Sequence, residues 1–138
     1  MPARDLFHDS VRHGLEKEGW KITSDPLTLK QDKQKVFIDL AAERLLQAER
    51  GKEKIAVEIK SFVGVSFIDD WHDAAGQFIN YRAVLRRKQP DRKLYLAVPQ
   101  ETYDELFQDG VAPISVEDNA IALLIYNATT EEIVEWKP

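Results

Sequence analysis

Three residues in the first half of the chain could perform chemistry together. Asp39 lies in an apolar segment, and Glu58 and Lys60 flank Ile59 further along. Carboxylates are the ligands that Mg²⁺ and Mn²⁺ prefer, and a bound divalent cation lowers the pKa of its water. A lysine beside them can orient that water or stabilise negative charge in a transition state. These residue types predict metal-dependent hydrolysis of a phosphodiester.

The segments that carry these residues have the period-two pattern of β-strands. In residues 36–42, Asp39 alternates with an aliphatic row, and in residues 54–62, Glu58 and Lys60 alternate with another. The two rows are Val36, Ile38 and Leu40, and Ile55, Val57 and Ile59. If the strands are neighbours that bury these rows on the same side, Asp39, Glu58 and Lys60 share the other face.

Two alternatives remain open for this face. Glu58 and Lys60 could form an ordinary surface ion pair. In addition, a regular hairpin centred on Gly51 pairs Asp39 with a residue near Val63, whereas a turn centred near residues 48–49 brings Asp39 level with Glu58. A bulge, a longer loop or a bend at residues 41–42 would reconcile these registers. The sequence does not choose among them.

The elements around the two strands predict one domain over residues 1–138. Helices are expected where apolar residues recur at helical spacing, and strands in the short apolar runs. Residues 24–26 and 49–53 read as turns, and residues 31–35 as a charged loop. The expected helices are 3–19, 68–88 and 99–107, and the expected strands are 20–23, resumed at 27–29, then 36–42, 54–62, 93–98, 120–126 and 131–136. This order indicates an α/β or α+β fold with a central mixed sheet flanked by helices.

Composition excludes several kinds of site. The chain has no cysteine and three scattered histidines, so a zinc site is not expected. No apolar run is long enough to span a membrane and no signal peptide is visible, so we expect a cytoplasmic protein. The net charge of −5 argues against a strong non-specific grip on nucleic acid, although it does not exclude a nuclease with acidic metal ligands.

Further residues could support the site. Gln77 and Tyr81 are four positions apart, so they share one helical face, and they either approach the site or pack on the sheet. Asp9 in the first helix and Glu43 beyond Asp39 are weaker candidates for metal ligands. Each has a simpler interpretation as a solvated surface residue.

The order of these residues resembles the PD-(D/E)XK nuclease superfamily, which has a restriction-endonuclease-like fold. Its signature is an acid on one strand and an acid-x-lysine on the next, matched here by Asp39 and by Glu58-Ile59-Lys60. The proline that usually precedes the first acid is replaced by Ile38. A Gln-x-x-x-Tyr pair, as at Gln77 and Tyr81, is similar to a feature of the Holliday-junction-resolvase-like branches, in which the glutamine approaches the active site.

A closer resemblance, to the XisH-like family, covers almost the whole chain. It is carried by short motifs, among them Gly76-Gln77-Phe78 with Tyr81-Arg82, where Arg82 would support the structure or contact DNA. The other motifs are Ala3-Arg4-Asp5 with His8, Gly19 to Thr23 with Asp25-Pro26, Ile38 to Glu43, Ile55 to Phe62, and Leu94 to Pro99. The family is named for cyanobacterial factors needed for programmed excision of a DNA element that interrupts a nitrogen-fixation operon.

This resemblance implies a set of partners: DNA, a small XisI-like protein, and the separate site-specific recombinase that cuts and joins. A second copy of the chain is a further candidate partner. Three hypotheses follow. The chain is a Mg²⁺-dependent deoxyribonuclease that uses Asp39, Glu58, Lys60 and Gln77, or a regulatory factor on a nuclease-like domain, or its acids and lysine form a structural ion-pair network. We favour the regulatory factor.

Overall fold

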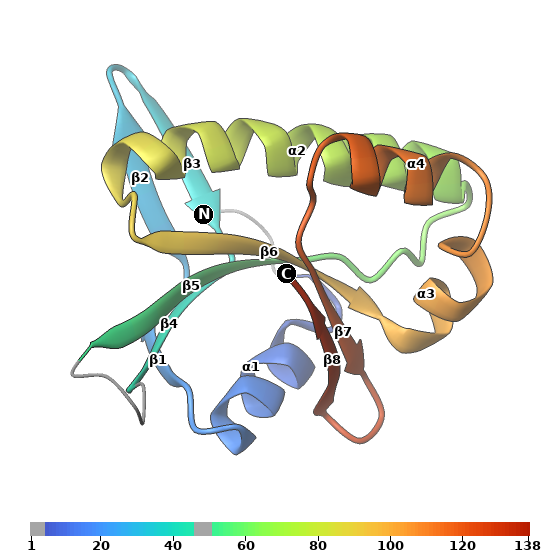
Figure 1. The fold of residues 1–138 in the computed structure, drawn as a ribbon, viewed down its shortest axis with the longest axis horizontal. Helices are drawn as coiled ribbons and strands as arrows, with labels where there is room; N and C mark the ends of the chain where they lie inside the picture. Colours follow the sequence, from blue (N-terminus) through green and yellow to red (C-terminus); the bar gives the residue numbers. More distant parts are fainter. Residues whose placement is uncertain (1–4, 46–50) are drawn as a thin grey trace.

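The computed structural model describes residues 5–45 and 51–138, which form helices on both sides of a sheet (Figure 1). The helices are α1 (His8–Lys17), α2 (Phe67–Lys88), α3 (Gln100–Leu106) and α4 (Val111–Asp118). The strands are β1 (Lys21–Ser24), β2 (Leu27–Gln31), β3 (Gln34–Ile38), β4 (Leu40–Leu45), β5 (Lys52–Ile59), β6 (Arg92–Pro99), β7 (Leu123–Asn127) and β8 (Glu132–Lys137).

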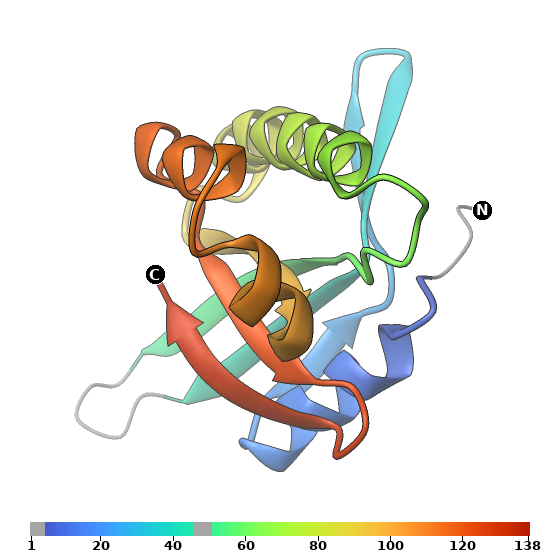
Figure 2. The same ribbon diagram turned by 90° about the vertical axis from the view of Figure 1, so that its right-hand side faces the viewer.

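The six-stranded sheet has the order β1-β4-β5-β6-β7-β8. Its central strands β5, β6 and β7 run parallel, and the outer neighbours pair antiparallel. Helices α2 and α4 lie over one face and α1 lies under the other, as Figures 1 and 2 show. The expected mixed sheet flanked by helices is therefore confirmed.

The apolar core forms a layer on each face of the sheet, and β5 contributes to both. Ala56 belongs to the layer under α2, which also contains Trp71 and Phe78. Ile55, Val57 and Ile59 belong to the layer over α1, together with Val11 and Leu15 of that helix. Burial on both faces is typical of the central parallel strands of such a sheet.

The predicted strand over residues 36–42 is wrong as one element, because the chain changes sheets at Asp39. Residues up to Ile38 pair with β2 in a separate two-stranded sheet, and residues from Leu40 pair with β5. As a result, Ile38 packs in the layer under α2 and Leu40 in the layer over α1. The alternation of side chains is interrupted at the break, so the predicted shared aliphatic face does not form.

The segment 31–35, predicted as a loop, is the end of a β-hairpin formed by β2 and β3. The hairpin projects beyond the six-stranded sheet in both views (Figures 1 and 2). Leu27 and Leu29 are buried against the body of the protein, whereas residues 32–35 are exposed. The polar composition of residues 31–35 indicated exposure correctly but concealed a strand.

The register between β4 and β5 places Leu40 opposite Val57. One further step along this antiparallel register brings Asp39 level with Glu58. This is the register that the sequence associated with a turn near residues 48–49; residues 46–50 lie outside the described part. Helix α4 was not predicted, because its short sequence has little apolar periodicity. It begins after Gly110, which has a positive φ of 81°, and carries a proline in its first turn.

Candidate functional site

Asp39 and Glu58 form a pair of carboxyl groups where β3 ends and β4 begins beside β5. The Ile59 backbone N–H donates to Asp39 Oδ2 at 2.7 Å, and the Asp39 backbone N–H donates to Glu58 Oε1 at 3.3 Å. The two carboxyl groups also share a hydrogen bond. These backbone contacts fix the position of both side chains, so the structure brings the two predicted acids together.

Burial dominates the electrostatics of this pair. Glu58 is buried, with 6% of its surface exposed. The pKa of Glu58 is raised to about 9, first by burial and then by the negative charge of Asp39, against the opposing effect of the Lys60 ammonium. Burial also raises the pKa of Asp39, against the hydrogen bond from Ile59. Two adjacent carboxyl groups in this setting either share protons or bind a cation.

Lys60 lies immediately after β5, at the carboxyl end of the parallel strands. Its backbone N–H donates to the Ala97 carbonyl at 3.1 Å, and its carbonyl accepts from the Tyr126 hydroxyl at 3.2 Å. A hollow of about 240 Å³, lined in part by Lys60, Asp5 and Asp73, opens beside it. Ligands of open α/β sheets bind outside the carboxyl ends of the strands, which is the position of Lys60 and the carboxyl pair.

Helix α2 contributes Tyr81 and Gln77 from above the sheet. Tyr81 is half-buried, and its pKa is raised by burial and then by the charges of Glu58 and Asp39. Gln77 lies one turn earlier, and its buried Oε1 accepts no hydrogen bond from the part of the chain that the structure describes. An unpaired buried acceptor costs stability, and a bound water, ion or ligand would satisfy it.

Replacing Gln77 with methionine should therefore stabilise the protein. Methionine has a similar shape and removes the unpaired oxygen, so the free energy of unfolding should rise by about 1 kcal/mol. Urea denaturation measures this change. Gln89→Met is the matched control in α2's C-cap: Gln89 Oε1 accepts from Arg92 Nε at 2.7 Å, so this variant should lose stability. Equal losses in both variants would show that Gln77 is paired in solution.

Two N-terminal residues near the site were missed as functional candidates. The Asp5 carboxylate accepts from the Ser61 backbone N–H at 3.0 Å, and its charge raises the pKa of Asp39. His8, which is 3% exposed, lies 2.8 Å from Asp25, and its charge acts on Asp39 in the opposite direction. His8 shares a helical face with Val11 and Leu15, and this spacing was the available signal for a buried histidine.

The remaining candidates lie elsewhere. Asp9 is exposed in the first turn of α1. The N-terminal acid whose charge raises the pKa of Asp39 is instead Asp5. Glu43 is four residues from Asp39, roughly 13 Å along a strand. Its carboxylate lies 3.5 Å from both Lys52 and Arg92. Arg82 donates to the carbonyls of residues 119 and 120, so it joins α2 to the loop after α4.

The oxygen donors around Asp39 are of the kind that a divalent cation prefers. The described residues contain no cluster of three or more His, Cys, Asp or Glu side chains suited to hold a metal. They do contain the Asp39–Glu58 pair and the unpartnered Gln77 oxygen. Mg²⁺ commonly binds through one or two carboxylates and keeps several waters, so two acids in contact fit this ion. None of the described helices has the length and apolarity to cross a membrane.

Comparisons with known proteins agree on one family. The family model described as "XisH protein" matches residues 1–134. The crystal structure of an XisH family protein from Nostoc punctiforme is 47% identical, with a TM-score of 0.88, and the match covers 97% of this chain and all of that one. A fdxN element excision controlling factor protein from Anabaena variabilis is 43% identical, with a TM-score of 0.87, over 98% of this chain and all of that one. No curated protein matched. The chain belongs to the XisH family.

Proposed function

We propose that the protein is an excision-controlling factor that assists site-specific recombination, built on a PD-(D/E)XK nuclease-like domain that binds Mg²⁺ or Mn²⁺. The buried Asp39–Glu58 pair beside Lys60 is the observation that carries this proposal. The relative from Anabaena variabilis is a fdxN element excision controlling factor protein, which supports the biological role. A separate site-specific recombinase would cut and join the DNA.

Each residue of the site has a role in this proposal. Asp39 and Glu58 would hold the cation, which supplies charge neutralisation for DNA phosphate oxygens. Lys60 lies at the end of the same strand as Glu58 and would contact a phosphate or a developing negative charge. Gln77 would offer its unpartnered oxygen to the cation or to a bound water, and Tyr81 would border the site from α2. The site would then bind DNA. The proposed protein partners are an XisI-like protein, a recombinase or a second copy of the chain.

The β2–β3 hairpin offers a surface for DNA. Lys30 and Lys35 are directly opposite each other across the two strands, and Lys33 lies in the turn beyond them. Like charges in this arrangement destabilise a sheet, and a DNA phosphate bound between them would relieve that repulsion. Lys30, Lys33 and Lys35 form what we call the lysine arm. It is connected to the carboxyl pair through β3, which carries Lys35 and ends one residue before Asp39.

The lysine arm leads to a prediction about salt dependence. Changing Lys30, Lys33 and Lys35 to glutamine should weaken DNA binding and flatten the slope of log K against log salt by up to about 2.7, since each duplex phosphate contact contributes about 0.9. Fluorescence anisotropy with labelled duplex DNA measures both quantities. The matched control changes the exposed Lys17, Lys21 and Lys88 instead. If the control flattens the slope equally, the arm has no special role in DNA binding.

An active Mg²⁺-dependent endonuclease is the second candidate function, favoured by the presence of the complete acid, acid and lysine set. One experiment separates the two functions: excision by the cognate recombinase is measured with and without this protein, in parallel with cleavage of duplex, nicked and branched DNA. We expect faster excision and no cleavage by the protein alone. Cleavage that is lost in Asp39→Asn would establish the endonuclease instead. If the protein neither speeds excision nor cleaves DNA, both proposals are contradicted.

A further inference from the structure

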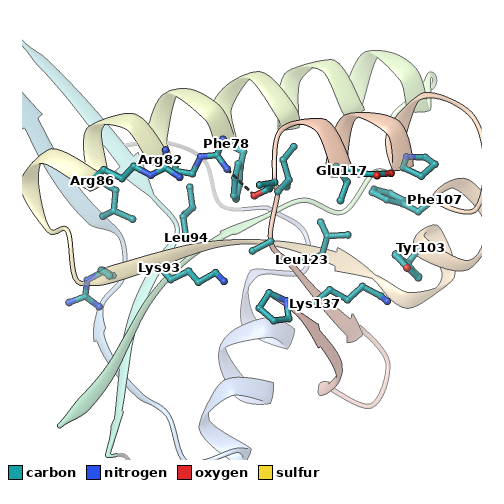
Figure 3. Close-up of a pocket in the computed structure, with 18 of the residues that line it drawn as sticks. Phe78, Arg82, Arg86, Lys93, Leu94, Tyr103, Phe107, Glu117, Leu123 and Lys137 are labelled. Carbon is teal, nitrogen blue, oxygen red and sulfur yellow. Dashed lines mark hydrogen bonds between the residues drawn. The ribbon is translucent and has the colours of Figure 1, made fainter.

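A second cavity lies nearer the amino ends of the parallel strands, and neither Asp39 nor Glu58 lines it. It has a volume of about 750 Å³ and opens between α2, α4 and the starts of β6 and β7 (Figure 3). Leu94 and Leu123 line it near the amino ends of these parallel strands, whereas Lys60 follows the carboxyl end of β5. The cavity is therefore separate from the proposed metal site, and its size is typical of sites for small molecules.

The inner wall of this cavity is apolar and partly aromatic. Phe78 of α2, Leu94 of β6 and Phe107 after α3 line it and are each buried in the core layer under α2. Tyr103 stacks on Phe107 with ring centroids 5.6 Å apart. Phe78, Leu94 and Phe107 form the closed floor. The half-buried Tyr103 and Val116 offer the accessible apolar surface, against which a flat or extended apolar group would replace water.

The polar residues around the cavity are mainly cationic. Its lining includes Arg82, Arg86, Arg92, Lys93 and Lys137, but the acidic members are Asp91 and Glu117. This balance is opposite to that of the whole chain, which has 19 Lys and Arg and 24 Asp and Glu. Some of these charges are paired outside the cavity: Asp91 lies 3.1 Å from Lys54, Arg92 3.5 Å from Glu43, and Lys137 2.9 Å from Glu135. The remaining charges of the lining are those of Arg82, Arg86, Lys93 and Glu117, which are still mainly cationic. An anion would therefore be favoured over a cation or a neutral ligand.

Two arginines concentrate this charge on one helical face. Arg82 and Arg86 are four residues apart, and neither has a carboxylate partner among the described residues. Arg82 is held by the carbonyls of residues 119 and 120 at 2.8 and 2.9 Å and lies over the Phe78 ring at 5.2 Å. Burial and then the charge of Arg86 lower the pKa of Arg82. A bound anion would relieve this repulsion between guanidinium groups.

We propose that this cavity binds a small organic anion with an apolar body, its charged group at Arg82 and Arg86 and its body against the half-buried Tyr103 and Val116. Nucleoside monophosphates and medium-chain or aromatic carboxylates share this chemistry. The site does not depend on the function proposed above, since no residue of the carboxyl pair lines it.

The test uses the full chain and three probes: AMP, decanoate and inorganic phosphate. Backbone amide shifts in two-dimensional NMR titrations give both the dissociation constant and the location of binding. We expect AMP or decanoate to saturate with a dissociation constant below about 1 mM and inorganic phosphate to bind at least about tenfold more weakly, because it lacks the apolar body. Which of the two probes saturates distinguishes a phosphate ligand from a carboxylate ligand.

Arg86→Gln should weaken that binding by about tenfold, the usual effect of losing one hydrogen bond to a charged group. Arg86 is exposed, so this variant should fold. Arg87→Gln is the matched control: Arg87 is the next residue of α2, donates to the Ala83 carbonyl and does not line the cavity. The proposal is overturned if neither organic probe saturates, if inorganic phosphate binds equally well, if the shifts map to residues 58–61, or if both arginine variants weaken binding equally.

Discussion

Asp39→Asn is expected to weaken binding of Mn²⁺ at least about a hundredfold. Residues that only hydrogen-bond the ligands of a metal typically contribute about 10–100-fold to its affinity. Loss of the charge of a ligand itself should therefore reach the upper end of that range. Asparagine keeps an acceptor for the Ile59 N–H, which lies 2.7 Å from Asp39 Oδ2. The fold should therefore be retained while the charge is lost. Isothermal titration calorimetry with MnCl₂ measures the affinity directly.

Glu43→Gln is the control for this result, because it removes an acid from the same chain segment but from outside the pair. Its carboxylate lies near Lys52 and Arg92, so its loss should leave Mn²⁺ binding unchanged within a factor of about two. A second readout comes from Glu58, because its pKa is raised by burial and also by Asp39. In Asp39→Asn this pKa should fall but stay above 4.5. Unchanged Mn²⁺ affinity in Asp39→Asn would refute the metal site.

Glu58→Gln is expected to stabilise the metal-free protein strongly at pH 8. Glu58 has a folded-state pKa of about 9 against 4.5 for an ordinary glutamate. A raised folded pKa contributes stability that is fully present below pH 4.5 and is lost as pH rises towards 9. Between pH 5 and 8, the free energy of unfolding of the wild-type protein should fall by roughly 4 kcal/mol from this group. Glutamine does not ionise, so this loss should disappear.

Differential scanning calorimetry at pH 5 and pH 8 tests this second prediction. At pH 8 the Glu58→Gln variant should melt higher by about 10 °C, since 1 kcal/mol corresponds to a few degrees for a domain of this size. Saturating Mn²⁺ should raise the melting temperature of the wild-type protein but have little effect on the variant, because a ligand stabilises only the state that binds it. A pH-independent difference between the two proteins would indicate that Glu58 is not a buried titrating group.

The sequence identified the carboxyl pair but not how the chain positions it. Glu58 and Lys60 could be placed because β5 is a regular strand whose alternation continues almost to Lys60. Asp39 could be placed only by assuming a register, because the strand that carries it breaks at that residue. A local period-two pattern carries no information about which partner strand each half will choose. The antiparallel register between β4 and β5 resolves this ambiguity.

The N-terminal contribution was harder to predict because it depends on tertiary contacts. Asp5 reaches the Ser61 backbone, 56 residues away in sequence, and no spacing rule predicts such a contact. Asp9 was the more obvious candidate because it occupies the acidic first turn of α1. Negative charge there also favours the helix dipole, so residue type alone could not separate a structural acid from a functional one.

The position of Asp39 at the junction of the two sheets joins the lysine arm mechanically to the carboxyl pair. The backbone of β3 passes directly into a residue that both accepts from Ile59 and donates to Glu58. A pull on the hairpin would therefore change the separation of the two carboxyl groups, and a cation held between them would stiffen the hairpin. Under the proposed function, tension in DNA held by the lysine arm and occupancy of the proposed cation site would both displace this same backbone segment.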